Sequence, residues 1–134
     1  MRDTGVIYGN SLHSLAAEEG IDALIKAELE AVEEDAISFM YPGLPENTKC
    51  IAYAAGGASA EELAVFSAGD GDVQSVKELL TERVADRIEA FASYKPGDVP
   101  KLENAVIKSG GGYVIFCVCD KWTEADKLAD ELLG

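Results

Sequence analysis

Hydrophobic residues recur along the chain with two different periods, and these periods predict its helices and strands. A recurrence every three to four residues is typical of an amphipathic helix, and it predicts helices over residues 21–40, 73–91 and 123–132. Shorter runs rich in β-branched and aromatic residues predict strands over residues 50–54, 61–68, 105–109 and 113–119.

The order of these elements contains the same supersecondary unit twice. Residues 50–80 and 105–133 each run as strand, glycine-rich turn, strand, Asp and amphipathic helix. Each unit buries its apolar faces only against the other, which predicts a single domain over residues 11–134. The predicted fold is α+β, with a four-stranded, mainly antiparallel sheet packed with helices in the order α-β-β-α-β-β-α. Residues 1–10 are expected to be loosely ordered, and residues 11–19 to form a short helix.

Apolar residues occupy both faces of two predicted strands. In one strand, Leu63 and Val65 are expected on one face and Ala64 and Phe66 on the other. The strand over residues 113–119 is apolar throughout, which is typical of a central strand that is covered on both sides. The cover is either a helix or another subunit, so a homodimer through the sheet face is one prediction.

The charge of the chain excludes two classes of partner. With 25 acidic residues and 11 basic ones, the formal net charge is -14, so a basic face for nucleic acid is not expected. Adsorption to anionic lipid is disfavoured for the same reason. No stretch is apolar and long enough to predict a transmembrane helix, and the N-terminal residues do not resemble a signal peptide. Either the protein is cytoplasmic, or the sequence given has been trimmed at its start.

Cysteine and glycine residues suggest no cofactor. Cys117 and Cys119 are expected on one face of a strand, at or beyond the distance of a relaxed disulfide, and Cys50 reaches them only from a neighbouring strand. The chain has one histidine, so the thiols lack an evident fourth metal ligand, and we expect buried free cysteines and no metal. The glycines at 56–57 and 110–112 lead into strands and not into helices, which predicts turns and not phosphate loops.

Adjacent carboxylates offer the most interesting candidate site. Glu61 and Glu62 follow the first glycine turn, and as strand neighbours they should point to opposite faces of the sheet. One is then expected to face solvent, and the other to face inward toward Arg83 or Arg87. A structural salt bridge is the simpler interpretation. The alternative is a ligand-binding site made of Ser59, Glu61, Glu62 and Arg83.

Several short motifs of the chain, each weak alone, together resemble one bacterial family. They are Gly57 to Phe66, Tyr41 to Leu44, Arg83, Tyr94, Asn104 to Lys108, and Gly112 to Val114. The chain resembles the family of bacterial domains of unknown function numbered 4358, over about residues 21–133. The resemblance implies a small protein of Gram-positive bacteria, often exported and anchored through a lipoprotein signal. It implies no activity and transfers no catalytic residue.

Three hypotheses for function follow. The first is a non-enzymatic, extracytoplasmic, lipoprotein-type domain that binds a protein partner or a cell-envelope ligand. Its anchoring signal is absent from the sequence given, so the compartment rests on the family resemblance. The second is a cytoplasmic regulatory or scaffold domain that associates with itself through the sheet face. The third is an acid-assisted hydrolase that uses Glu61 or Glu62.

Overall fold

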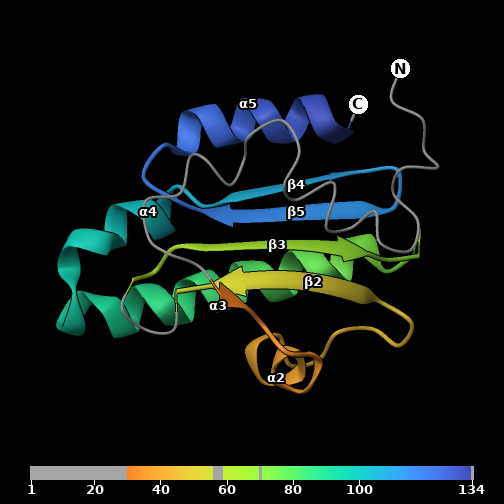
Figure 1. Cartoon of the computed structure of the whole chain (residues 1–134), viewed down its shortest axis with the longest axis horizontal. Helices are drawn as coiled ribbons and strands as arrows, with labels where there is room; N and C mark the ends of the chain where they lie inside the picture. The colour runs from red at the N-terminus through yellow and green to blue at the C-terminus, as the bar shows by residue number, and fades with distance from the viewer. Residues whose placement is uncertain (1–29, 56–58, 70, 134) are drawn as a thin grey trace.

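A five-stranded antiparallel sheet forms the centre of the protein (Figure 1). The structure is a computed structural model, and it describes residues 30–55, 59–69 and 71–133. The strands are β1 (Glu30–Ala31), β2 (Lys49–Ala54), β3 (Glu62–Ser67), β4 (Val106–Gly110) and β5 (Tyr113–Val118). Their order across the sheet is β1-β2-β3-β5-β4, and each neighbouring pair is antiparallel. The α+β class and the four predicted strands are confirmed, and a fifth strand extends the sheet.

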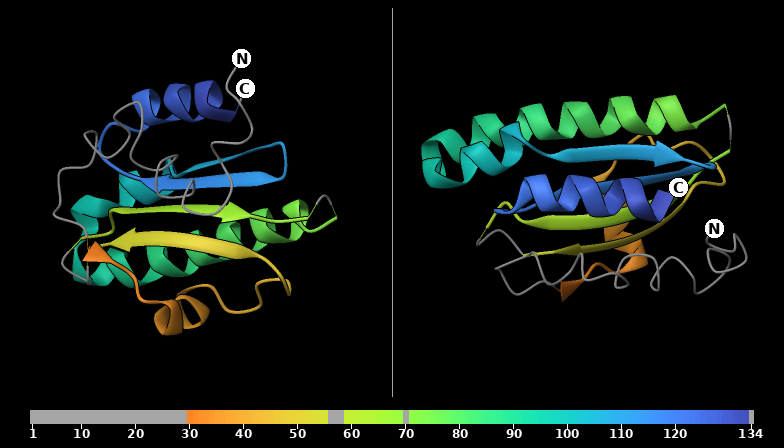
Figure 2. Two further views of the ribbon diagram at one scale, coloured as in Figure 1. Left: turned by 45° about the vertical axis from the view of Figure 1, so that its right-hand side comes forward. Right: turned by 90° about the horizontal axis from the view of Figure 1, so that it is seen from above.

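Helices cover both faces of this sheet. They are α2 (Glu34–Met40), α3 (Val73–Tyr94), the 3-10 turn η4 (Pro96–Asp98), α4 (Val99–Glu103) and α5 (Trp122–Leu133). Seen from above, α3 and α4 lie on one face and α5 lies on the other (Figure 2). Helix α2 lies at the edge of the sheet, beside β2 (Figure 1).

Within the described residues, the helix predicted over residues 21–40 is confirmed over Glu34–Met40, as α2, and wrong over residues 30–33. Glu30 and Ala31 form a short edge strand that pairs with Ala54 and Tyr53 of β2. Both residues are exposed, so they show no alternation of buried and exposed positions that would predict a strand. Their pairing with β2 overrides the local helical pattern. The part of the predicted helix before Glu30 lies outside the described residues, as do the segments 1–10 and 11–19.

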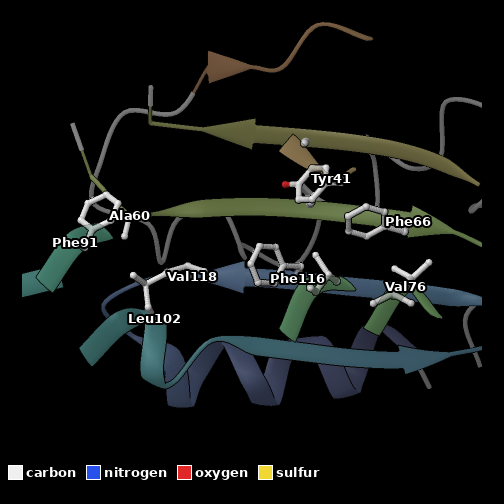
Figure 3. Close-up of a cluster of buried hydrophobic side chains, with 12 residues drawn as sticks. Tyr41, Ala60, Phe66, Val76, Phe91, Leu102, Phe116 and Val118 are labelled. Atoms are coloured by element: carbon white, nitrogen blue, oxygen red, sulfur yellow. The ribbon is translucent and has the colours of Figure 1, made fainter. Parts of the chain in front are cut away.

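Two hydrophobic clusters lie on the two faces of the sheet, and the strand alternation predicts their membership. Leu63 and Val65 of β3 pack in the cluster under α5, whereas Ala64 and Phe66 pack in the cluster under α3. Figure 3 shows the second cluster, in which Phe66 lies beside other buried side chains from the sheet and the helices. Strands β3 and β5 lie side by side at the centre, as the apolar character of β5 predicts.

The repeated unit is present in chain order, as β2-β3-α3 and β4-β5-α5. A rotation that exchanges the antiparallel neighbours β3 and β5 has its axis perpendicular to the sheet, and it would leave both helices on one face. The helices instead pack on opposite faces, since their buried side chains belong to different clusters. The two units therefore share a local pattern without a common rotation.

The cysteines lie where the strand pattern predicts. Cys117 and Cys119 are buried together in the cluster under α5, and Cys50 packs on the opposite face of the sheet. Strand β2 is not a neighbour of β5, so Cys50 is separated from the other two thiols. All three cysteines are free. Burial, and then the nearby charge of Glu62, raises the pKa of Cys50 to about 12.

Candidate functional site

A fully buried carboxylate, Glu62, sits at the start of β3 and receives four hydrogen bonds. Its Oε1 accepts from Nη2 of Arg83 at 2.9 Å and from Nη1 of Arg87 at 2.6 Å. Its Oε2 accepts from Nε of Arg83 at 3.1 Å and from the hydroxyl of Tyr41. Glu62 and Arg83 thus form a two-pronged pair, which is the strongest geometry for a carboxylate and a guanidinium.

Local structure places these groups together. Arg83 and Arg87 are one helical turn apart on α3, so both lie on the flank of the helix that faces the start of β3. Arg83 also donates from Nη1 to the carbonyl oxygen of Met40, the last residue of α2, at 2.9 Å. The guanidinium of Arg83 lies 5.0 Å from the ring centre of Tyr41, at a distance typical of a cation–π contact. The network therefore ties α2 and α3 to the sheet.

Two guanidinium groups share this one carboxylate, so the network holds more positive than negative charge. Burial lowers the pKa of Arg87, although Glu62 opposes that shift. Burial and the neighbouring Glu62 raise the pKa of Tyr41 far above its ordinary range, so its hydroxyl stays protonated and donates to Glu62. The Arg83 and Arg87 side chains are 17% and 18% exposed, so their charges reach the surface.

A second buried cluster surrounds the neighbouring residue, Glu61. Asp98 accepts from the backbone N–H of Ala60 at 2.8 Å and from Oγ of Ser59 at 3.2 Å. Nζ of Lys101 lies 3.5 Å from both Oε2 of Glu61 and Oδ1 of Asp98. Burial alone would raise the pKa of Asp98, but the Ala60 hydrogen bond and Lys101 lower it overall.

The structure divides the four predicted site residues between these two clusters. Ser59 and Glu61 lie with Asp98, whereas Glu62 lies with Arg83. The expectation that one of the two glutamates faces solvent is wrong, because Glu61 is 1% exposed and Glu62 is fully buried. Glu61 finds its cation on α4, a helix that the sequence pattern did not predict. The expected contact of Glu62 with α3 is confirmed.

A groove of about 310 Å³ lies between α2 and α3, above the Glu62 network. Its lining residues come from the end of α2 and from one flank of α3: Phe39, Met40, Pro42, Leu79, Glu82, Arg83, Asp86 and Arg87. Phe39 is 86% exposed and Tyr94 is 68% exposed, and they are the exposed large hydrophobic side chains of the described residues. The apolar recurrence that predicts the helix over residues 21–40 includes Phe39 and therefore predicts that this side chain is buried, which is wrong, and no sequence pattern indicates the groove.

The register of α2 explains why Phe39 is exposed. Successive helical residues are separated by about 100°, so Phe39 lies about 200° around the helix from Ile37. Ile37 and Met40 pack against the buried cluster, which turns Phe39 outward. Helix α2 has seven residues, too few for the apolar spacing to determine from the sequence which side faces the core.

The fold defines an α+β domain with an antiparallel sheet between helical layers. The family model described as "Domain of unknown function (DUF4358)" matches residues 46–119, more than half of the chain. The chain therefore belongs to this family. The comparison with curated proteins and the comparison with solved structures give no match.

Metal-ligand groups and membrane-spanning helices are both absent among the described residues. Among these residues, no three His, Cys, Asp or Glu side chains are grouped so that they could hold a metal ion. Within the same part of the chain, none of the helices combines the length and apolar character needed to cross a bilayer.

Proposed function

We propose that this chain is a non-enzymatic, extracytoplasmic domain that binds a protein partner through the groove between α2 and α3. The observation that carries the proposal is the exposure of Phe39, 86%, at the edge of a groove. Exposure of an aromatic side chain to water is unfavourable in the isolated protein, and burial of that side chain against a partner would lower the free energy of the complex.

The composition of the groove supports a protein partner. Aromatic residues, Met and Arg are enriched in protein interfaces, and Tyr, Trp and Arg dominate their binding energy. The groove combines Phe39 and Met40 with Arg83 and Arg87, whose side chains are held in place by Glu62. A side chain that is already ordered loses less entropy when a partner binds.

The buried carboxylates support binding over hydrolysis. A general acid or base must come within hydrogen-bond distance of its substrate. Glu62 is instead enclosed by two arginines and Tyr41, and Glu61 lies 3.5 Å from Lys101. Three surface hollows lined by described residues contain neither glutamate.

The proposed compartment is the outer side of the cytoplasmic membrane, with a lipid anchor. Membership of the family supports it, through the lipoprotein character that the resemblance implies. The test is to express the complete gene product in a Gram-positive host and to label the cells with radioactive palmitate. Labelled protein in the membrane fraction is expected, whereas unlabelled protein in the cytosol would favour the cytoplasmic hypothesis.

Site-specific crosslinking tests the binding surface. A photoreactive phenylalanine analogue in place of Phe39 is expected to give a discrete crosslinked product in living cells. The matched control carries the same analogue at Glu124, an exposed position on α5, on the opposite face of the sheet. Equal crosslinking from the two positions would contradict the proposal, and a crosslink between two copies of the chain would favour self-association.

A further inference from the structure

The hydrogen bonds of Arg87 are incomplete within the described part of the chain. A guanidinium has five N–H donors, and among the described residues Arg87 uses one nitrogen, Nη1, which donates to Glu62. Glu62 already receives four hydrogen bonds, so it has little remaining capacity to accept. The Nε and Nη2 groups of Arg87 are therefore available to acceptors that enter the groove, which Arg87 lines.

The network of Glu62 and its two arginines carries a net positive charge that is partly shielded from water. One carboxylate faces two guanidiniums, and Arg87 is 18% exposed. Apolar groups from Phe39, Met40 and Leu79 line the same groove. A guanidinium in such surroundings binds a carboxylate more strongly than an exposed one, because water competes less for both groups.

Acidic residues at the rim limit the charge that a ligand can carry. Glu82 and Asp86 are exposed, line the groove, and form no ion pair with Arg83 or Arg87 within the described residues. They would repel a polyanion, as would the net charge of -14. The ligand best suited to the groove therefore has a single negative charge next to an apolar group.

We propose that the groove recognises a peptide segment in which one carboxylate lies beside an apolar side chain. The carboxylate accepts from Nε and Nη2 of Arg87, and the apolar side chain packs against Phe39 and Leu79. This inference rests on the proposed function and names the class of its partner. The carboxylate belongs either to the C-terminus of the peptide or to an Asp or Glu side chain.

Three short peptides separate these sources in an NMR titration of the full 134-residue chain labelled with ¹⁵N. They are acetyl-Gly-Gly-Phe with a free C-terminus, the same peptide as its C-terminal amide, and acetyl-Gly-Glu-Phe amide. At least one carboxylate peptide is expected to bind tenfold or more tightly than the uncharged amide. Its binding should shift the amide signals of residues 39–41 and 79–87. Equal affinity of all three peptides, or no binding by either carboxylate peptide, would overturn the inference.

Variants of the groove test the role of Arg87 and of the rim. Arg87→Gln is expected to lower the affinity for the carboxylate peptide at least tenfold, while Arg87→Lys retains part of it. Glu82→Gln with Asp86→Gln should raise the affinity two- to fivefold, because it removes repulsion. Glu124→Gln with Glu131→Gln removes the same charge from α5 and should leave the affinity unchanged. Each variant is compared at equal folded fraction, measured by thermal unfolding.

The sign of the rim effect is decisive. A loss of affinity for the carboxylate peptide in the Glu82→Gln, Asp86→Gln variant would show that the rim carboxylates do not repel the bound peptide, and it would refute the inference. The experiment also separates this inference from the proposed function. Specific crosslinking from position 39 without carboxylate binding would reject the ligand class alone. Carboxylate binding without any protein crosslink would reject the protein partner.

Discussion

Glu61 and Glu62 are neighbours in the sequence and both are buried, yet different cations surround them. Glu62 is one carboxylate held by two guanidiniums, whereas Glu61 and Asp98 are two carboxylates that share Lys101. The distances differ as well, with 2.6 and 2.9 Å for the nearest arginine contacts of Glu62 and 3.5 Å for Lys101. The strand alternation that separates the two side chains thus creates two clusters with different properties.

This difference indicates which cluster can contribute side chains to a binding surface. The arginines around Glu62 line the groove between α2 and α3, so the Glu62 network connects the core to the proposed binding surface. The cluster around Glu61 joins the segment before β3 to η4 and α4, and it satisfies backbone and side-chain groups of that junction. The binding surface that we propose therefore belongs to the first cluster, whereas the contacts of the second join the segment before β3 to η4 and α4.

The largest expected effect comes from removing the carboxylate of Glu62. Glu62→Gln leaves two partly buried guanidiniums without a counter-charge, and breaking a buried pair in this way costs about 3–5 kcal/mol. Urea unfolding of the full chain, followed by circular dichroism, measures the loss. The exposed Glu46→Gln is the matched control and should change the free energy of unfolding by less than about 0.5 kcal/mol. Equal effects of the two substitutions would show that the network contributes nothing to stability.

The hydroxyl of Tyr41 should contribute the next largest effect. Tyr41→Phe keeps the ring that packs edge-on against Phe66, with centroids 5.1 Å apart, and removes the donor to Glu62. A hydrogen bond to a charged group contributes about 1.5–3 kcal/mol, so a loss in that range is expected in the same unfolding assay. If Tyr41→Phe is as stable as the parent, the hydrogen bond adds no net stability.

Much of the fold follows from local sequence patterns. The strands β2 to β5, the buried stripes of α3 and α5, and the alternation of Leu63, Ala64 and Val65 are each set by neighbours in the chain. Edge strand β1 was not predicted, because its pairing depends on β2, which lies about 20 residues away in the register of Glu30 with Ala54. The short helix α4 was missed because five residues give too little periodicity.

The candidate site was predictable only in part for the same reason. The contact between Glu62 and Arg83 follows from an inward strand position followed by a helix that covers the sheet. The partners of Glu61 do not, since Asp98 and Lys101 belong to α4 and its preceding turn. The apolar recurrence over residues 21–40 predicts a buried Phe39, whereas α2 has only seven residues, too few for periodicity to determine which side faces inward.

A smaller loss of stability is expected at Glu61. Glu61→Gln removes a carboxylate whose contact with Nζ of Lys101, at 3.5 Å, is longer than the 2.6 and 2.9 Å contacts of Glu62 with its two arginines. Lys101 also keeps Asp98 as a partner. The expected cost is about 1 kcal/mol, in line with an ordinary hydrogen bond. A loss as large as that of Glu62→Gln would contradict the difference between the two clusters.

The smallest effect is a dependence on pH that Asp98 confers on the Glu61 cluster. The folded state lowers the pKa of Asp98 below its ordinary value of 3.8, so folding favours the ionised form. Its contribution is therefore complete above about pH 5 and is lost as the pH falls through the folded pKa. Asp98→Asn should destabilise the chain most at neutral pH, and the difference from the parent should shrink between about pH 4 and pH 2. If the free energies of unfolding of the parent and of Asp98→Asn differ by a constant amount over that pH range, ionisation of Asp98 does not stabilise the fold. The Glu61 cluster would then be held by its neutral hydrogen bonds.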